Sequence, residues 1–170
     1  VRDKESADRE LLRQLQEITS LCRSRSAGYV VNDRVDLALA ARASGVHLGQ
    51  TDLPVSIARR ILGSRAIIGL STHNREQFEG GLAEEVDYLA VGPIFPTHTK
   101  DTGYPALGTE FLQQIRGLCR IPLVAIGGIT ADNILSIRQN GADSAAVISA
   151  ISCAADPAAA IQRLLETAYR

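Results

Sequence analysis

The sequence predicts an α/β fold of consecutive βα units, and its apolar pattern, turn residues and glycines all support that fold class. Short runs rich in β-branched residues alternate with longer amphipathic stretches, and such runs indicate parallel strands that are buried on both faces. The strand centres lie 16, 22, 21, 35 and 23 residues apart, at Val30, Val46, Ile68, Leu89, Val124 and Val147. Intervals of this length accommodate one helix between successive strands.

Strands and helices can be assigned in order from this pattern. Strands are expected at 28–31, 46–48, 66–70, 88–91, 122–126 and 145–148. Helices are expected at 7–25, 35–44, 54–63, 75–84, 109–119, 131–140 and 156–169, several of them after an Asp, Ser or Thr that can cap a helix. Polar residues gather after the strands, and in a parallel α/β fold those strand ends share one face. Residues far apart in the sequence are therefore expected to form one site.

Two architectures fit the alternation, a doubly wound sheet and a TIM (β/α)₈ barrel. The GxGxxG pattern of a dinucleotide fold does not occur, whereas AIGGI at 125–129 followed one unit later by VISAI at 147–151 suits the phosphate site after strands seven and eight of a barrel. The barrel is therefore favoured. Counting back from those strands places Val1-Arg2 at the end of strand two, so we expect a single domain over 1–170 that lacks the first strand and helix.

Length, composition and cysteine usage limit the classes of function. The chain has 170 residues, of which 45% are apolar and 22% charged, and its formal net charge is −1. No basic surface for nucleic acid is indicated, no apolar run approaches the roughly 20 residues of a membrane-spanning helix, and the N-terminus does not resemble a signal peptide. Cys22, Cys119 and Cys153 fit neither a metal site nor a disulfide framework, so buried or half-buried thiols and a cytoplasmic location are expected.

Two aspartates follow consecutive predicted strands. Asp33 comes directly after Asn32, and Asp52 lies 19 residues further along the chain. Oxygen ligands suit Mg²⁺, which typically takes one or two carboxylates and completes its shell with water and phosphate oxygens. Each aspartate also has a structural interpretation, Asp33 as the cap of a helix at 34–44 and Asp52 as the cap of a turn before Pro54. The residues alone leave both interpretations open.

Basic residues near the N-terminus are candidates for binding phosphate. Arg2 and Lys4 are spaced to point the same way if the backbone is extended there. An arginine grips phosphate with a planar fork, and a lysine adds a compact charge. Solvated charges at a chain end are the alternative interpretation.

The longest interval between strands carries the segment PTHTKDTG at 96–103. Long loops at this edge are usually functional. Thr97 and Thr99 can hydrogen-bond an anionic group, and the charge of Lys100 can stabilise a departing phosphate. An ordinary solvent-exposed loop is the alternative.

A second phosphate site is indicated by two neighbouring loops near the C-terminus. Gly127-Gly128 follows the strand at 122–126 and lets backbone N–H groups approach an anion with no Cβ in the way. Ile148-Ser149 ends the next strand, and the segment at 149–155 can open a short helix whose N-terminus attracts phosphate. A tight turn is the alternative role of the two glycines.

The histidines carry a weaker signal. His47 lies inside a predicted strand and is expected to be partnered within the fold. His73 follows Ser71-Thr72 and is a candidate acid or base, while His98 is expected to point outward. No chemical step is assigned to His73 or His98.

Seven segments together resemble, in order and spacing, the motifs of the thiamine-phosphate synthase family. They are VRDK at 1–4, VNDRVDLALA at 31–40, GVHLGQTDLP at 45–54, IIGLSTHN at 67–74, VGPIFPTHTK at 91–100, VAIGGIT at 124–130 and VISAIS at 147–152. The resemblance covers essentially the whole chain. That family is a TIM barrel that joins a pyrimidine methyl diphosphate to a thiazole phosphate and releases pyrophosphate with Mg²⁺, so the resemblance implies the same fold, transferase activity, substrates and cofactor.

The resemblance also implies roles for individual residues. Those matched to the pyrimidine diphosphate are Arg2, Lys4, Asn32, Ser71 and Lys100. Those matched to magnesium are Asp33 and Asp52. Those matched to the thiazole phosphate are Thr97, Thr99, Gly128, Ile148 and Ser149. Arg2, Lys4 and Lys100 are the implied catalytic residues, because with magnesium they would neutralise charge on the departing pyrophosphate while the thiazole nitrogen captures a carbocation-like methylene.

Two alternatives compete with this function. A thiazole tautomerase relative from the same superfamily needs neither diphosphate nor magnesium, and retention of Asn32-Asp33, Asp52 and Thr99-Lys100 argues against it. A non-catalytic, phosphate-binding relic is favoured by the missing first unit, since a barrel lacking one strand has two unpaired edges. A homo-oligomer is compatible with either the synthase or its alternatives.

Overall fold

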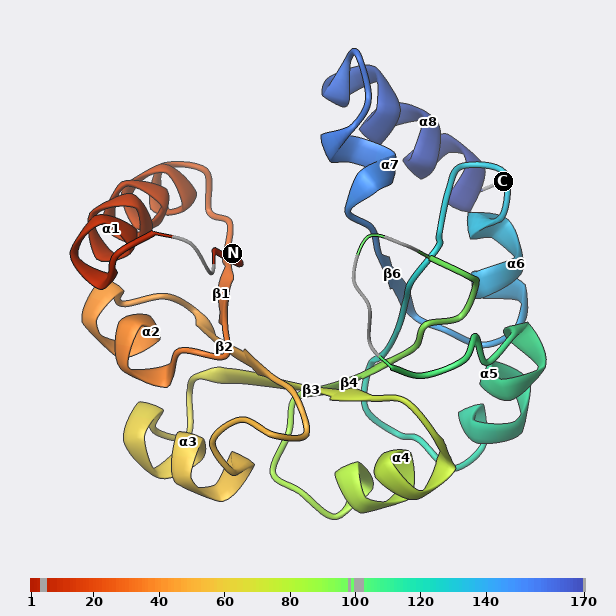
Figure 1. Ribbon diagram of the computed structural model, residues 1–170, viewed down its shortest axis with the longest axis horizontal. Coiled ribbons are helices and arrows are strands. Elements are labelled where there is room, and N and C mark those ends of the chain that lie inside the picture. The colour runs from red at the N-terminus through yellow and green to blue at the C-terminus, as the bar shows by residue number, and fades with distance from the viewer. Residues whose placement is uncertain (4–5, 98, 100–102, 170) are drawn as a thin grey trace. The chain divides into compact units, whose positions relative to one another are not determined.

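The computed structural model describes residues 1–3, 6–97, 99 and 103–169, and it confirms the alternation of strands with helices (Figure 1). The chain forms two compact units. The first unit comprises Val1–Ser71 and Ala83–Asp87, and the second comprises Thr72–Leu82 and 88–170.

The first unit contains parallel strands joined by helices. Its strands are β1 (Val30–Asn32), β2 (Gly45–Leu48) and most of β3 (Ile67–Thr72), and its helices are α1 (Asp8–Ser24), α2 (Val35–Ala41) and α3 (Val55–Leu62). Strand β2 pairs with both neighbours, with Val46 beside Val31 and Ile68. Val1 also lies beside β1 in parallel, since its amino group donates to the Val30 carbonyl at 2.6 Å and its carbonyl accepts from Asn32 N–H at 2.9 Å. Val1 is therefore placed as a strand residue beside β1, in agreement with the expected strand end at Val1-Arg2.

The second unit repeats the same βα pattern. Its strands are β4 (Tyr88–Val91), β5 (Leu123–Ile126) and β6 (Ser144–Ala146), which pair in parallel in that order. Its helices are α4 (Arg75–Leu82), α5 (Thr109–Arg116), α6 (Ile134–Gln139), α7 (Ser149–Ser152) and α8 (Pro157–Ala168). The end of β3 also belongs here, and the hydroxyl of Thr72, buried, donates to the Ala90 carbonyl at 3.1 Å.

Some predicted boundaries and burial states were wrong. Strand β3 continues through Thr72, so Ser71 lies within a strand rather than after it. Strand β6 ends at Ala146, and its first residue, Ser144, is exposed, so burial on both faces does not hold there. Among the cysteines, Cys119 is buried and Cys22 half-buried, but Cys153 is exposed. The cause is local, because Cys153 follows the short helix α7, which buries none of its residues.

An Asp–Arg arrangement anchors the start of β3 in the first unit. The Asp87 carboxylate accepts from Ile68 N–H at 2.7 Å, and the Asp87 N–H donates to the Ile68 carbonyl at 2.7 Å. Arg59, from the helix preceding β3, contacts the same carboxylate at 2.7 Å. The Asp87 side chain, which lies just before the next strand, therefore links α3 to β3.

The second unit has the same arrangement at the start of β5. The Asp143 carboxylate accepts from Leu123 N–H at 2.8 Å and contacts Arg116 at 2.6 Å, while the Asp143 N–H donates to the Leu123 carbonyl at 2.9 Å. Burial raises the pKa of Asp143, but the Leu123 N–H and Arg116 outweigh it and the pKa lies below its usual value. These contacts lie at the amino ends of the strands, where residues of α/β barrels serve stability.

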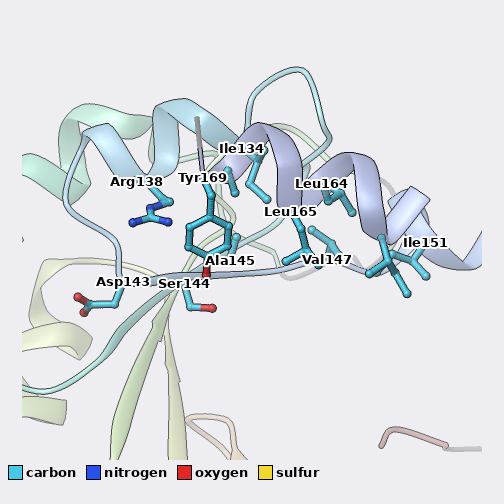
Figure 2. Close-up of a pocket in the computed structure, with 12 residues that line it drawn as sticks. Ile134, Arg138, Asp143, Ser144, Ala145, Val147, Ile151, Leu164, Leu165 and Tyr169 are labelled. Atoms are coloured by element: carbon cyan, nitrogen blue, oxygen red, sulfur yellow. The ribbon is translucent and has the colours of Figure 1, made fainter. Parts of the chain in front are cut away.

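A pocket lies between α8 and the segments around α6 and β6, and Figure 2 shows its apolar lining. Arg138 covers the ring of Tyr169 there, with 4.4 Å from the guanidinium carbon to the ring centroid. The lining residues are Ile134, Arg138, Asp143, Ser144, Ala145, Val147, Ile151, Ile161, Leu164, Leu165, Ala168 and Tyr169. None of the predicted site residues lines this pocket.

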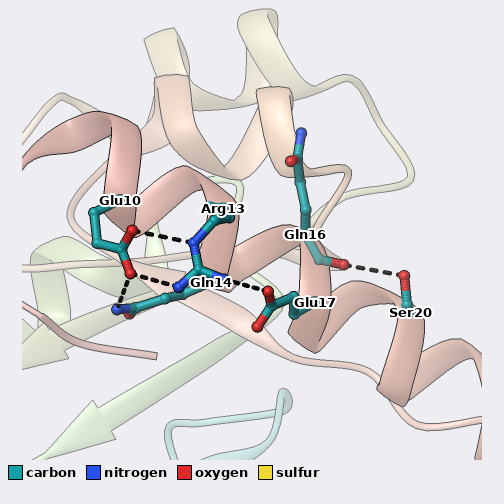
Figure 3. A network of polar contacts seen from close by, with 6 residues as sticks. All are labelled: Glu10, Arg13, Gln14, Gln16, Glu17 and Ser20. Carbon is teal, nitrogen blue, oxygen red and sulfur yellow. Dashed lines mark hydrogen bonds and ion pairs between the residues drawn. The ribbon is translucent and has the colours of Figure 1, made fainter.

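Helix α1 shows how sequence periodicity becomes packing. Leu11, Leu15 and Thr19 recur every four residues and are the buried positions of the helix, as expected for an amphipathic helix. On the solvent side, Arg13 forms ion pairs with Glu10 at 2.7 Å and with Glu17 (Figure 3). Exposed ion pairs of this kind contribute little to stability, because water screens them, so the buried positions hold α1 in place.

No helix in the described part of the chain is long and apolar enough to cross a membrane.

Candidate functional site

Asp33 ends β1 in an unusual backbone conformation. Its φ is 65°, in the left-handed region that residues with a Cβ rarely adopt. The Asp33 N–H donates to the His47 carbonyl at 2.8 Å, and the next N–H, of Arg34, turns back to the Asn32 carbonyl at 2.8 Å. Strained residues of this kind cluster at functional sites. The expectation that Asp33 caps the following helix was wrong, because α2 begins after Arg34 with no side-chain cap.

Asp52 lies in the turn after β2. Its Oδ2 accepts from Gly49 N–H at 2.7 Å, and its own N–H donates to the Gly49 carbonyl at 3.3 Å. The predicted turn-capping role of Asp52 is therefore confirmed. This role does not exclude a ligand, since a carboxylate has about four acceptor positions.

Ser71 is held by two neighbours at the end of β3. Its hydroxyl shares a hydrogen bond of 2.7 Å with His47 Nε2, and its carbonyl accepts from Gln50 Nε2 at 2.8 Å. The prediction that His47 is partnered within the fold is confirmed. His47 thus orients the Ser71 hydroxyl, to which the family resemblance assigns diphosphate binding, and Gln50 holds the Ser71 backbone.

The donor set of the first unit fits magnesium. Asp33 follows β1 and Asp52 follows β2. These two strands pair with each other, so that Asn32 lies beside His47, and both aspartates are half-buried. Among the described residues, no group of three or more His, Cys, Asp or Glu side chains is placed to hold a metal. Mg²⁺ usually needs only one or two carboxylates, because water and substrate phosphates supply its other ligands.

Three of the basic and histidine predictions lie outside the described residues, at Lys4, His98 and Lys100. Arg2 is described and exposed, one residue beyond the pairing of Val1 with β1. The roles predicted for Arg2, Lys4 and Lys100 stay predictions.

The Gly127-Gly128 turn after β5 is required by packing. Both residues have positive φ, 95° and 64°. A Cβ on Gly128 would lie 2.6 Å from the Pro96 carbonyl oxygen, and one on Gly127 would lie 2.6 Å from the Pro93 Cβ. The Gly127 carbonyl in turn accepts from Phe95 N–H at 3.1 Å. The tight-turn interpretation is therefore confirmed, and phosphate binding at Gly128 stays a prediction.

The structure brings the long loop and the last strand end together within the second unit. The Thr99 hydroxyl donates to the Ser149 hydroxyl at 3.2 Å, and the Thr99 N–H donates to the Thr97 hydroxyl at 3.2 Å. Ser149 begins α7, which confirms the expected short helix, and Ile148 before it is 49% exposed. Hydroxyls from positions 50 residues apart thus meet at one place.

Sequence reasoning missed a cluster around His73. Its ring stacks on Tyr104 with centroids 4.6 Å apart, and its Nδ1 donates to the Gly92 carbonyl at 2.5 Å. Gln77 links the same two residues, accepting from His73 N–H and donating to the Tyr104 hydroxyl, both at 2.9 Å. No local pattern signals a contact between rings 31 residues apart in sequence.

Comparison with known proteins identifies the family. The family profile for thiamine monophosphate synthase matches residues 1–151. This chain belongs to the thiamine monophosphate synthase family. A Nostoc punctiforme thiamine-phosphate synthase is 46% identical over 169 residues, which are 99% of this chain and 48% of that protein. The Syntrophomonas wolfei thiamine-phosphate synthase is 47% identical over 156 residues, which are 92% of this chain and 75% of that protein.

A solved structure supports the predicted fold class. The thiamine phosphate pyrophosphorylase from Pyrococcus furiosus superposes with a TM-score of 0.91 at 36% identity, over 99% of this chain and 80% of the other. The predicted α/β fold of barrel type is therefore confirmed. The chain spans about half the length of several curated synthases that it matches, including the one from Nostoc punctiforme.

Proposed function

We propose that this chain is a thiamine-phosphate synthase domain over residues 1–170. It would join 4-amino-2-methyl-5-(diphosphooxymethyl)pyrimidine to a thiazole phosphate, giving thiamine phosphate and pyrophosphate. The observation that carries the proposal is the family membership, together with the retention of every residue type that the reaction needs at the strand ends.

The first unit would bind the pyrimidine diphosphate. Asp33 and Asp52 would hold Mg²⁺, which when bound supplies positive charge to the diphosphate. Asn32 and Ser71 offer polar groups at the ends of β1 and β3, and His47 fixes the Ser71 hydroxyl. The proposed role of Arg2, with Lys4 and Lys100, is to add positive charge around the diphosphate oxygens.

The second unit would bind the thiazole phosphate. Thr99 and Ser149 already present neighbouring hydroxyls, 3.2 Å apart, and Thr97 orients the Thr99 backbone. Gly128 and Ile148 carry no charged group. Their backbone N–H groups would therefore approach the same phosphate without repulsion. Hydroxyls and backbone N–H groups bind phosphate without competing negative charge.

The proposed reaction needs charge stabilisation more than proton transfer. The bond between the pyrimidine methylene carbon and the diphosphate oxygen breaks, the thiazole nitrogen forms the new bond to that carbon, and pyrophosphate leaves with the electron pair. Arg2, Lys4 and Lys100 would stabilise the negative charge that develops on the leaving group. No side chain has to act as a general acid or base. This agrees with the hydrogen bond between His47 Nε2 and the Ser71 hydroxyl, which already occupies that ring nitrogen.

The direct test is product formation by the purified chain. Pyrophosphate release and thiamine phosphate formation are measured with both substrates, with and without Mg²⁺. We expect magnesium-dependent turnover, and we expect Asp33→Ala to lower it by about 100-fold or more, as removal of one charge-stabilising group does in other enzymes.

A matched variant controls for the loss of a carboxylate. Glu79→Gln removes an exposed acidic charge on α4, where Glu79 pairs with Arg75, and should leave turnover unchanged. Turnover that is independent of Mg²⁺ and of Asp33 would contradict the proposed metal site. Thiazole isomerisation without pyrophosphate release would instead identify a tautomerase, and binding of thiazole phosphate without turnover would identify a non-catalytic relic.

The proposal has corollaries for location and partners. Substrates of this kind are small phosphorylated molecules, so we infer a cytoplasmic enzyme with no nucleic-acid or membrane partner. A homo-oligomer is also proposed, and sedimentation of the purified chain measures it directly.

A further inference from the structure

The His73 cluster has no role in the proposed reaction, although it touches the loop that carries Thr97 and Thr99. His73 follows β3 and Gln77 lies in α4, whereas Gly92 and Tyr104 lie at the start and the return of the segment between β4 and α5. All four residues belong to the second unit. We call the part that begins at Gly92 the outgoing limb of this segment and the part that contains Tyr104 its returning limb. The His73 ring contacts both limbs, at Gly92 and at Tyr104.

Backbone hydrogen bonds join the two limbs at their base, where Leu107 N–H donates to the Pro93 carbonyl at 2.8 Å and Gly108 N–H donates to the Ile94 carbonyl at 3.0 Å. The outgoing limb is tied down by backbone hydrogen bonds, from Ile94 N–H to the Ile126 carbonyl at 2.9 Å and from Phe95 N–H to the Gly127 carbonyl at 3.1 Å. On the returning limb, Tyr104 is 38% exposed and is held by the stack on His73 and by the hydrogen bond from Gln77. Beyond the backbone bonds at the base of the limb, side-chain contacts with His73 and Gln77 therefore also hold Tyr104.

We propose that His73 and Tyr104 are positioning residues that hold the two limbs of this segment together, so that the outgoing limb, which leads to Thr97 and Thr99, keeps the conformation that binds the thiazole phosphate. This inference rests on the proposed function of the second unit. Aromatic pairs stabilise a contact beyond the area that they bury, and the near-parallel rings, inclined by 14°, have the stacked geometry.

The hydrogen bonding of His73 favours positioning over chemistry. A carbonyl oxygen only accepts, so Nδ1 carries the hydrogen that is donated to Gly92. This nitrogen is committed to the backbone of the outgoing limb, while the ring face is committed to Tyr104 on the returning limb. His73 therefore links the two limbs.

A lysine-specific protease measures the opening of this segment without any need for activity. Lys4 and Lys100 are the lysines of the sequence, so a cut after Lys100 reports access to the loop and a cut after Lys4 is an internal reference. We expect Tyr104→Ala and His73→Ala to be cut after Lys100 about tenfold faster than the wild-type chain, because local opening controls such cleavage. Tyr104→Phe keeps the stack and should remain within about threefold of wild type.

Tyr169→Ala is the matched control, because it removes another exposed tyrosine ring that also packs on a neighbouring side chain. It should be cut after Lys100 at the wild-type rate. Thermal unfolding of each variant shows whether the whole fold has changed. Equal cutting of wild type and Tyr104→Ala would overturn the inference. If His73→Ala does not fold, Tyr104→Ala still provides the test, because Tyr104 is an exposed residue.

Steady-state kinetics separates positioning from chemistry. We expect Tyr104→Ala to raise the KM for thiazole phosphate about tenfold, with kcat and the KM for the pyrimidine diphosphate within about threefold, and Tyr104→Phe to restore the wild-type KM. Loss of kcat in His73→Ala with an unchanged rate of cutting would overturn positioning in favour of a chemical role. If the wild-type chain shows no turnover, the proposed function fails, while the cleavage rates still decide whether the stack holds the loop.

Discussion

The loops that follow β1 and β5 both turn the chain through positive φ, but they do so with opposite residue types. After β5 the turn uses Gly127 and Gly128, and a Cβ on Gly128 would collide with the Pro96 carbonyl. After β1 the corresponding conformation belongs to Asp33, a residue with a Cβ and a charged carboxylate. Packing therefore dictates the residue type in the loop of the second unit.

Asp33 has this conformation with a Cβ and a carboxylate in place. A residue with a Cβ in the left-handed region costs roughly 1 kcal/mol relative to glycine, although Asp is one of the residues that adopt it through local hydrogen bonds. The carboxylate itself is the feature that glycine would lack. The comparison teaches that one loop is shaped by steric fit and the other by the chemistry of its side chain, which agrees with the proposed role of Asp33 in holding Mg²⁺.

The largest expected effect concerns the steric side of this comparison. We expect Gly128→Ala to lower the free energy of unfolding by about 3 kcal/mol, since it adds a clash with backbone to an unfavourable φ. Gly117→Ala is the control, because Gly117 has φ −64° and no heavy atom within 4 Å of the added Cβ, and it should change the free energy of unfolding by less than about 1 kcal/mol. Urea unfolding measures both, and equal changes would show that neither the φ of Gly128 nor its contact with Pro96 matters.

The paired Asp–Arg anchors test whether the two units are stabilised alike. Asp87→Ala and Asp143→Ala should each lower the free energy of unfolding by about 2 kcal/mol at neutral pH, because each leaves a strand N–H without its acceptor and removes the ion pair with an arginine. Denaturant unfolding of the two variants checks this. A loss confined to one variant would mean that the two anchors, despite similar geometry, contribute differently to the free energy of unfolding.

The anchor at Asp143 also predicts a pH dependence. The pKa of Asp143 is held below its usual value of 3.8 in the folded chain, so its stabilising effect is complete above that value and is lost as the pH falls through the lower folded pKa. The difference in unfolding free energy between wild type and Asp143→Ala should therefore shrink as the pH falls below the usual value of 3.8. A difference that stays constant over this range would contradict the ion pair with Arg116.

A smaller effect of opposite sign is expected on the chemical side of the comparison. Asp33→Gly should raise the free energy of unfolding by about 1 kcal/mol while magnesium-dependent turnover is lost. Arg42→Gly is the matched control, since Arg42 has φ 54° at the end of α2, and it should gain similar stability with turnover retained. Destabilisation by Asp33→Gly would show that the aspartate side chain supports the fold after all.

The smallest effect is expected on the surface of α1. Arg13→Ala removes the ion pairs with Glu10 and Glu17 (Figure 3), and it should leave the free energy of unfolding nearly unchanged, because water screens these exposed charges. The residual effect should diminish in 1 M salt, which screens exposed charges. Thermal unfolding at low and high salt checks this prediction, and it sets the scale against which the buried anchors are judged.

Local patterns were sufficient for much of the fold and part of the candidate site. The β-branched runs predicted the strands around Val31, Val46 and Leu89, because strand burial depends on side chains that are close in sequence. The same patterns could not predict that Ser71 lies inside β3 or that Cys153 is exposed. Strand ends and the burial of single residues depend on neighbours from other segments. They also left open a helix-cap role for Asp33, whereas the N-cap position of α2 belongs to Arg34.

The sequence by itself determined the order of βα units, the family resemblance and the residue types at each strand end, because periodicity and motifs are properties of neighbouring residues. Only the tertiary structure decided that Gly128 has no room for a Cβ, that Asp87 and Asp143 are equivalent anchors and that His73 stacks on Tyr104. Each of these contacts joins residues about 20 or more positions apart. Distances between such residues are set by how strands pair and helices pack, which no single stretch of sequence encodes.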